Sequence, residues 1–144
     1  MTDFETVSAI TENMAAALQS AGIRFTRKGF DDIKNVPATL LPLGEIFYNG
    51  ETFEVASGER PGYAEAEFTV RVVIGAMEPA DAMREQQRTG HGMREALNVS
   101  SLNAGSLAAD KPVSRVRVER LQAENHRSLS PVNCKVIVRY REAA

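Results

Sequence analysis

The stretch from residue 131 to 141, Pro-Val-Asn-Cys-Lys-Val-Ile-Val-Arg-Tyr-Arg, alternates between apolar and polar residues with Ile137 as the one exception. Successive side chains of a β-strand point to opposite faces of a sheet, so this pattern predicts a half-buried strand. Residues 68–74 and 114–119 show the same period of two and are also rich in β-branched residues. Together the three stretches predict a sheet with one apolar face and one polar face.

The polar face of this predicted sheet is rich in basic side chains. Its acidic members are Glu67 and Glu119, and its basic members are Arg71, Arg115, Arg117, Lys135, Arg139 and Arg141. Six basic and two acidic residues give the face a net charge of +4, whereas the whole chain has a net charge of −2. We consider three interpretations: a solvated outer face, a contact with nucleic-acid phosphate, and a contact with the acidic surface of an identical neighbour. The absence of an aromatic stacking platform on this face disfavours nucleic acid.

Two segments have the apolar spacing of amphipathic helices. Residues 2–5 read Thr-x-x-Glu, a capping box, and Gly22 is a suitable stop, which predicts a helix over about residues 3–21. Pro79 is a favourable first residue for a second helix over residues 79–98. Its predicted inner stripe is Met83, Gln87, Gly90, Met93 or Arg94, and Leu97. The predicted core places Val70, Val72, Val116, Val136 and Val138 beneath Val7, Met14, Leu18, Met83 and Leu97.

The remaining segments carry turn and loop signals. Residues 23–35 predict a solvated loop, and the prolines in residues 36–43 permit an edge strand at most. Asn49-Gly50 between two apolar runs predicts a β-hairpin. A glycine-rich exposed loop is expected at about residues 56–65, with a spacing that fits no phosphate-binding motif. Residues 99–111 predict a loop with a short turn.

No motif in the chain has the spacing that catalysis or metal binding requires. His91, His126, the Asp31-Asp32 pair and Cys134 were each considered, and none has the partners of a catalytic triad or a metal site. We therefore expect no catalytic residue, no cofactor and no metal, and a packed, unreactive Cys134. The single cysteine, the lack of a signal-like N-terminus and the lack of a long apolar run predict a cytosolic protein with no membrane partner.

The length of 144 residues and the 43% hydrophobic content predict one domain over residues 1–144. The expected fold is α+β, with a mostly antiparallel or mixed sheet and two main helices packed on one face. The expected order is a helix, a proline-bearing segment, a hairpin and loop, a strand, a second helix and two final strands.

This order, together with three short motifs, resembles the phage tail terminator family, which includes the minor tail protein U of phage lambda. The motifs are Leu40-Leu41-Pro42-Leu43 after the first helix, the strand 68–74 leading into a helix that ends Glu95-Ala96-Leu97, and the closing Val-Ile-Val-Arg-Tyr-Arg of residues 136–141. The resemblance extends over essentially the whole chain. It implies an α+β protein that forms a homo-oligomeric ring, expected to be hexameric, in the virion tail.

A tail terminator of this kind would be assembled in the host cytoplasm and would have no enzymatic activity. The resemblance implies that the ring stops growth of the tail tube, offers a surface to the head–tail connector and lets DNA pass through its lumen. Glu59 and Arg60 in the predicted loop join the six basic residues of the sheet as candidates for subunit contacts. Two alternatives stay open: a head-completion or neck protein, and a small α+β module that binds a ligand or a peptide.

Overall fold

The computed structural model describes residues 1–29, 36–55, 62–75, 78–125 and 129–143. Within them the helices are α1 (Asp3–Ser20), α2 (Pro79–Ala96) and α3 (Val99–Leu102), with short 3-10 turns η2 (Ala38–Leu40) and η3 (Gly105–Leu107). The strands are β1 (Phe25–Lys28), β2 (Leu43–Phe53), β3 (Tyr63–Ile74), β4 (Val113–Ala123) and β5 (Ser130–Arg141). They form one sheet in the order β1-β2-β3-β5-β4, in which β1 is parallel to β2 and all other neighbours are antiparallel. The predicted α+β class with a mixed sheet is confirmed.

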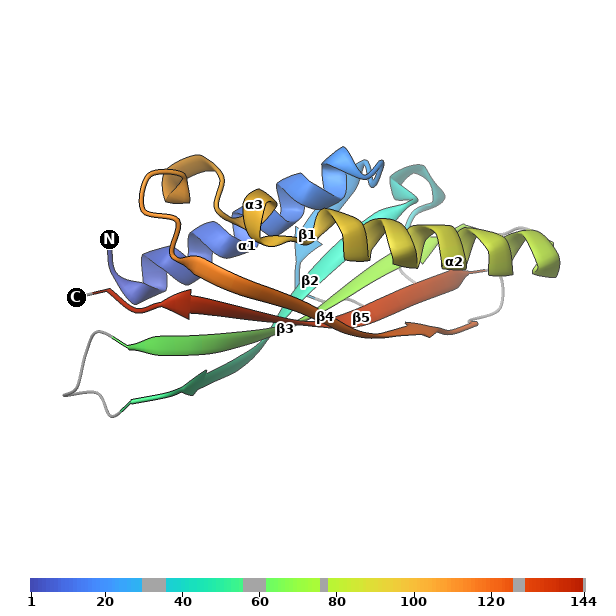
Figure 1. Cartoon of the computed structure of the whole chain (residues 1–144). Coiled ribbons are helices and arrows are strands. Elements are labelled where there is room, and N and C mark those ends of the chain that lie inside the picture. Colours follow the sequence, from blue (N-terminus) through green and yellow to red (C-terminus); the bar gives the residue numbers. More distant parts are fainter. Residues whose placement is uncertain (30–35, 56–61, 76–77, 126–128, 144) are drawn as a thin grey trace.

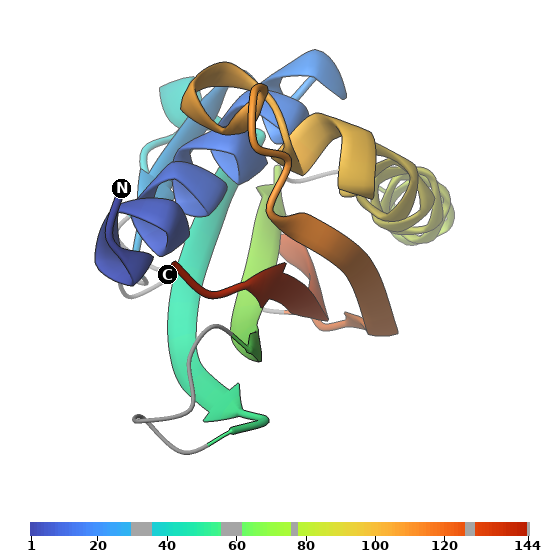
Figure 2. The ribbon, with the colours of Figure 1, turned by 60° about the vertical axis from the view of Figure 1, so that its left-hand side comes forward.

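The helices lie on one face of the sheet and leave the other face open (Figure 1). The view in Figure 2 shows the same layering, with α1 and α2 above the strands and the β2–β3 hairpin extending below them. This arrangement follows from the period-two pattern, because only one face of the sheet carries a continuous apolar surface that must be removed from water.

The register of the central strands is the one that the alternation predicts. Val70 pairs with Cys134 and Val72 pairs with Val132 along the antiparallel β3–β5 ladder. Val70, Val72, Val136 and Val138 are buried, whereas Val116 on the edge strand β4 is half-buried. A slip of one residue would have exposed these valines, so the predicted core of the sheet is confirmed.

Helix α1 begins and ends close to the predicted residues. The hydroxyl of Thr2 accepts a hydrogen bond from the backbone N–H of Glu5 at 3.1 Å. Gly22 lies just beyond the helix with a φ of +95°, a conformation in which glycine has no steric cost. The buried side of α1 includes Met14 and Leu18, as predicted. Phe4, in the first turn of the same helix, is exposed.

The predicted inner stripe of α2 is wrong in its first half. Met83 is 58% exposed and Gln87 is exposed, and the buried residues are Ala82, Gln86, Gly90 and Met93. The reason is a buried glutamine: the Gln86 amide donates to the backbone oxygens of Glu124 at 2.8 Å and Pro131 at 3.1 Å. A polar residue whose hydrogen bonds are satisfied by carbonyls can be buried, which an apolar stripe does not reveal.

One segment in the N-terminal half differs from the sequence prediction, and the proline-bearing segment that follows agrees with it. Residues 25–28, expected in a loop, form edge strand β1 alongside β2. The segment with Pro37 and Pro42 forms η2 and a cis peptide bond between Leu41 and Pro42, and β2 begins only at Leu43. Prolines lack the N–H that a ladder requires, so the chain enters the sheet directly after the second of them.

The Asn49-Gly50 pair does not form the predicted hairpin turn. Strand β2 continues through it, and the pairing with β3 shifts between Tyr48 and Gly50, which is a β-bulge. Gly50 has a φ of +123°, and the Asn49 amide donates to Glu67 at 3.1 Å and Thr69 at 2.9 Å. The hairpin instead joins β2 to β3. Of the loop expected at about 56–65, residues 56–61 lie outside the described residues and residues 63–65 belong to β3.

The position of Gly90 leads to a stability prediction. A Cβ at Gly90 would lie 3.2 Å from a methyl group of Leu121 and 3.5 Å from one of Val132, whereas a Cβ at Gly92 would meet nothing within 4 Å. Gly90→Leu should therefore overpack the helix–sheet contact and lower the free energy of unfolding by about 1–3 kcal/mol. The matched variant Gly92→Leu should raise it by about 0.5–1 kcal/mol through helix propensity. Urea unfolding measures both, and equal effects at the two glycines would contradict the proposed packing.

Candidate interaction surfaces

The open face of the sheet carries a network of ion pairs. Arg117 lies 3.4 Å from Glu65 and 3.7 Å from Glu119, and Lys135 lies 3.2 Å from Glu67 and 3.9 Å from Glu119. All these side chains are partly exposed, so each pair contributes only about 0–1 kcal/mol to stability. The network alternates basic and acidic groups across neighbouring strands.

Arg139 is held by two groups of its own chain. Its guanidinium donates to the Glu54 carboxylate at 3.0 Å and lies 3.9 Å from the centre of the Tyr63 ring. Arg115 and Arg141 are exposed, and Arg141 donates to the backbone oxygen of Asp110 at 3.3 Å. These two arginines therefore offer the most accessible positive charge among the predicted candidates.

This face is closer to neutral than the predicted net charge of +4. Glu45, Glu54 and Glu65 lie on it in addition to the two predicted acidic residues. Two of the three were missed because the predicted turn at residues 49–50 divided β2. Glu65 was missed because β3 begins at Tyr63 rather than at Glu67.

One carboxylate joins three strands at the β1 side of this face. Glu45 of β2 is fully buried, and its carboxylate accepts from the Nε of Arg27 of β1 at 2.8 Å and from the Nε of Arg71 of β3 at 2.7 Å. A second guanidinium nitrogen lies 2.7 Å (Arg27) and 2.5 Å (Arg71) from the same carboxylate oxygen that the Nε contacts, so each arginine is paired with one oxygen of Glu45 and both contacts are charge-assisted. Arg71, a predicted contact residue, is thus engaged inside its own chain.

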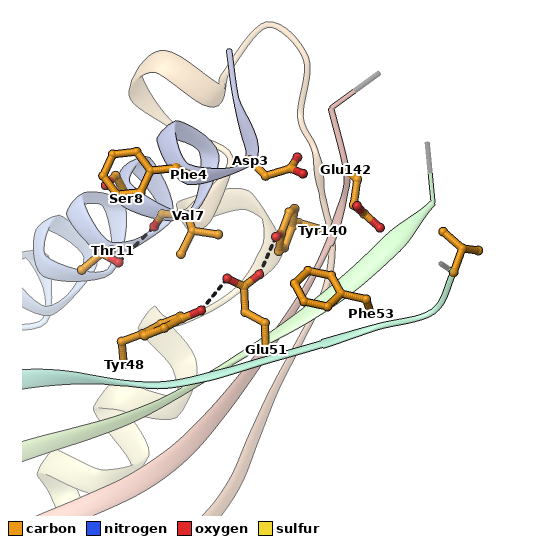
Figure 3. A pocket seen from close by; sticks show the side chains of 11 residues that line it. Asp3, Phe4, Val7, Ser8, Thr11, Tyr48, Glu51, Phe53, Tyr140 and Glu142 are labelled. Carbon is orange, nitrogen blue, oxygen red and sulfur yellow. Dashed lines mark hydrogen bonds between the residues drawn. The ribbon is translucent and has the colours of Figure 1, made fainter. Parts of the chain in front are cut away.

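A second surface is an open groove of about 600 Å³ between the first turns of α1 and the far end of β2. Figure 3 shows the side chains that line it, which come from α1, β2 and the C-terminal end of β5. The lining residues are Asp3, Phe4, Val7, Ser8, Thr11, Tyr48, Glu51, Phe53, Val55, Tyr140 and Glu142. The groove is thus mainly apolar, with acidic groups at its floor and rim.

The bulge at Asn49 creates the polar centre of this groove. Tyr48 and Glu51 are three residues apart, so a regular strand would point them to opposite faces. The extra residue brings them to the same face, opposite Phe68 and Ala66 of β3 respectively. Phe53 then follows on that face as well. Sequence reasoning missed the groove because it interpreted Asn49-Gly50 as a turn rather than as a change of phase within one strand.

Glu51 accepts hydrogen bonds from two tyrosines. The hydroxyl groups of Tyr48 and Tyr140 each donate to its carboxylate at 2.5 Å, as Figure 3 shows. Burial and the hydrogen bond to Glu51 raise the pKa of Tyr48 to about 12, and burial likewise raises the pKa of Tyr140. Both phenols therefore stay protonated at neutral pH. At the centre of the groove two aromatic rings therefore flank the carboxylate of Glu51.

Two of the residues that could carry chemistry, Cys134 and His91, lie within the described residues. Cys134 is buried, and burial raises the pKa of its thiol to about 12. His91 is exposed on α2. Asp31, Asp32, His126, Glu59 and Arg60 lie outside the described residues.

No group of three His, Cys, Asp or Glu residues among the described residues could hold a metal ion. None of the helices in the described ranges is both long and apolar enough to cross a membrane.

The ion pairs of the buried Glu45 carboxylate should contribute more to the free energy of unfolding than the exposed ion pairs do. Glu45→Gln should lower the free energy of unfolding by about 3 kcal/mol, because it removes the buried anion that both arginines contact. Glu65→Gln, which removes the exposed partner of Arg117, should cost at most about 1 kcal/mol. Urea unfolding at neutral pH compares the two. A Glu45 variant as stable as the Glu65 variant would show that the three-strand ion cluster is not a structural anchor.

The fold occurs in other proteins of known structure. No protein-family model and no curated protein sequence matches this chain. Thirty-one chains of solved structures match its fold. One belongs to the structure described as "Virion of native gene transfer agent (GTA) particle", with a TM-score of 0.53 and 15% sequence identity over 93% of this chain and 92% of that chain. At 15% sequence identity, this likeness in structure shows that the two chains share a fold.

Proposed function

We propose that this chain is a structural protein of a phage-like virion, a tail terminator that assembles into a closed ring on the tail tube. The observation that carries the proposal is the likeness in fold, over nearly the full length of both chains, to a chain of a gene transfer agent virion. The resemblance of the sequence motifs to the tail terminator family supports the finer assignment. In this role the protein has no catalytic activity and needs no cofactor.

The architecture is compatible with assembly through side chains rather than through strand pairing. Edge strand β4 has register shifts near residues 114 and 120, and Arg120 has a φ of +50°. Bulges and charges on an edge strand oppose pairing with a second sheet. Copies would therefore meet through surface groups, and a head-to-tail contact that closes on itself generates a ring.

The predicted contact residues remain part of this proposal, but they differ in how accessible they are to a neighbouring copy. Arg115 and Arg141 are accessible to a neighbouring copy, whereas Arg71, Arg117, Lys135 and Arg139 form ion pairs within the chain. Glu59 and Arg60 stay candidates outside the described residues. The proposed ring is a hexamer whose other partners are the tail tube protein and the head–tail connector, with DNA passing through the lumen.

A second candidate function is a module that binds a peptide or a small ligand. The groove beside α1 favours it, because a largely apolar cavity of about 600 Å³ with convergent polar groups is typical of such sites. A head-completion or neck protein is the nearest alternative within the virion. Observation of a stable ring with a lumen would favour a virion role over the binding module. Observation that the ring caps tail tubes would then favour a tail terminator over another neck protein.

The proposal predicts a defined assembly in solution. The purified chain, alone or with tail tubes, should sediment as a particle of about six copies at low salt. Exposed charges should contribute to the contact, and the Debye length falls from about 10 Å at 0.1 M to about 3 Å at 1 M salt. High salt should therefore shift the mass toward smaller species. A chain that sediments as a monomer at every concentration and salt, including with tail tubes present, would contradict the ring.

A further inference from the structure

The bulge in β2 contains a chemically reactive dipeptide. Asn49-Gly50 is the one Asn-Gly pair in the sequence, and asparagine is a thermolabile residue. The backbone nitrogen of the residue after an asparagine can attack the side-chain carbonyl carbon, and glycine hinders this attack least because it has no Cβ. A Cβ at Gly50 would meet nothing within 4 Å, but its φ is +123°. Backbone conformation rather than packing therefore requires the glycine.

The fold places this dipeptide where the ladder between β2 and β3 is interrupted. Tyr48 pairs with Phe68 and Gly50 pairs with Glu67, so Asn49 lies between two successive pairs of the register. Asn49 is also exposed to water. A bulge disrupts the ladder locally, and segments with exposed backbone hydrogen bonds open at a lower free energy than the core does. Water and backbone motion thus have access to the reacting groups.

The group that deamidation would remove is the one that joins the bulge to β3. The side-chain amide of Asn49 donates to a carboxylate oxygen of Glu67 at 3.1 Å and to the hydroxyl oxygen of Thr69 at 2.9 Å. A primary amide has two hydrogens to donate, so both are used. These contacts restrain the side chain. The reaction should therefore proceed from the locally opened bulge and slow down when the bulge is closed.

We propose that Asn49 is a site of spontaneous deamidation, and that its conversion destabilises the bulge on which the groove depends. The nitrogen of Gly50 loses its proton and bonds to Cγ of Asn49, the bond from Cγ to the amide nitrogen breaks, and ammonia leaves. Water then opens the cyclic imide. Hydrolysis at Cγ gives aspartate, whereas hydrolysis at the main-chain carbonyl gives isoaspartate, with a main chain that is longer by one carbon. The reaction consumes water, releases ammonia and oxidises nothing.

The product no longer fits the contacts of the amide. An ionised carboxylate only accepts hydrogen bonds, so it cannot donate to the carboxylate of Glu67. Two carboxylates on neighbouring strands also repel each other. Lys135 lies 3.2 Å from Glu67 and offsets part of this repulsion, so the effect falls on the bulge rather than on the whole sheet. Isoaspartate in addition changes the length of the strand at the point that sets its phase.

The groove depends on that phase. The bulge brings Glu51 to the side of Tyr48, where its carboxylate accepts from the hydroxyl groups of Tyr48 and Tyr140 (Figure 3). Loss of the bulge turns Glu51 away from these hydroxyl groups. The groove is then a property of the unmodified chain, and it is lost without an enzyme as the chain ages. This inference does not depend on the proposed ring.

Mass spectrometry of aged protein tests the site. The folded chain is incubated at neutral pH and physiological temperature, and the peptides that contain Asn49 and Asn98 are quantified in the same sample. Asn98 is a matched reference because it is exposed and its amide donates to backbone oxygens, but the β-branched Val99 follows it. Asn49 should convert to aspartate and isoaspartate at least about tenfold faster than Asn98. Equal rates would overturn the proposed site.

A pair of threonine variants tests the role of the amide contacts. Thr69→Val removes one acceptor of the Asn49 amide, and the loss of one hydrogen bond should raise the rate of deamidation about fivefold. Thr52→Val changes an exposed threonine of the same hairpin outside the bulge and should leave the rate unchanged. A rate in Thr69→Val equal to that of the parent would contradict the reaction from the opened bulge.

Titration of the tyrosines tests the effect on the groove. Asn49→Asp mimics one product, and the pKa of Tyr48 should fall from about 12 toward its ordinary value of about 10 as its contact with Glu51 is lost. Thr52→Asp places the same charge opposite Glu65 outside the bulge and should leave this pKa unchanged. Phenolate absorbance measures the titration, and circular dichroism checks that both variants are folded. If a folded Asn49→Asp titrates as the parent does, the proposed effect on the groove is wrong.

Discussion

The antiparallel pairing of β3 with β5 is the constraint on which the rest of the structure depends. The two strands pair from Tyr63 with Arg141 to Ile74 with Ser130, and their inward side chains are buried along the whole ladder. Removing that apolar surface from water requires a cover, which α1 and α2 supply on one face. The opposite face is left open in the described structure, and its charged groups are arranged as ion pairs between strands. A partner of this protein can therefore meet that charged face, the outer side of the helices, or the ends and edges of the two-layer body.

The parts of the fold that depend on long periodic patterns could be predicted from the sequence. The strands around Val70, Val116 and Val136 and the helix α1 follow directly from periods of 2 and 3.6. The short strand β1 could not be predicted in this way. Four residues are too few for a period, and β1 is held by the ion pairs of Glu45 with Arg27 and Arg71 between strands far apart in the sequence. The inner face of α2 was misassigned because hydrogen bonds to carbonyls, rather than apolarity, bury Gln86.

The candidate interaction surfaces were harder to predict from the sequence than the fold, because they depend on contacts between strands. The basic residues of the sheet face were correctly placed on one side, but their neutralisation depends on carboxylates whose strand positions were not predicted. The groove was missed entirely, because its formation depends on one extra residue at Asn49. That bulge turns Glu51 and Phe53 to the side of Tyr48 and so joins them to Phe4 and Tyr140. A local sequence signal was thus recognised, but the same glycine conformation serves both a turn and a bulge, and only pairing with β3 decides between them.

We propose that copies of the chain associate head to tail into a closed ring. Imaging of the assembled particle by electron cryomicroscopy tests this claim most directly. The proposed assembly is a ring with a single rotational axis and a lumen. A dimer related by a two-fold axis with the same surface on both copies, or particles with no defined assembly, would contradict it.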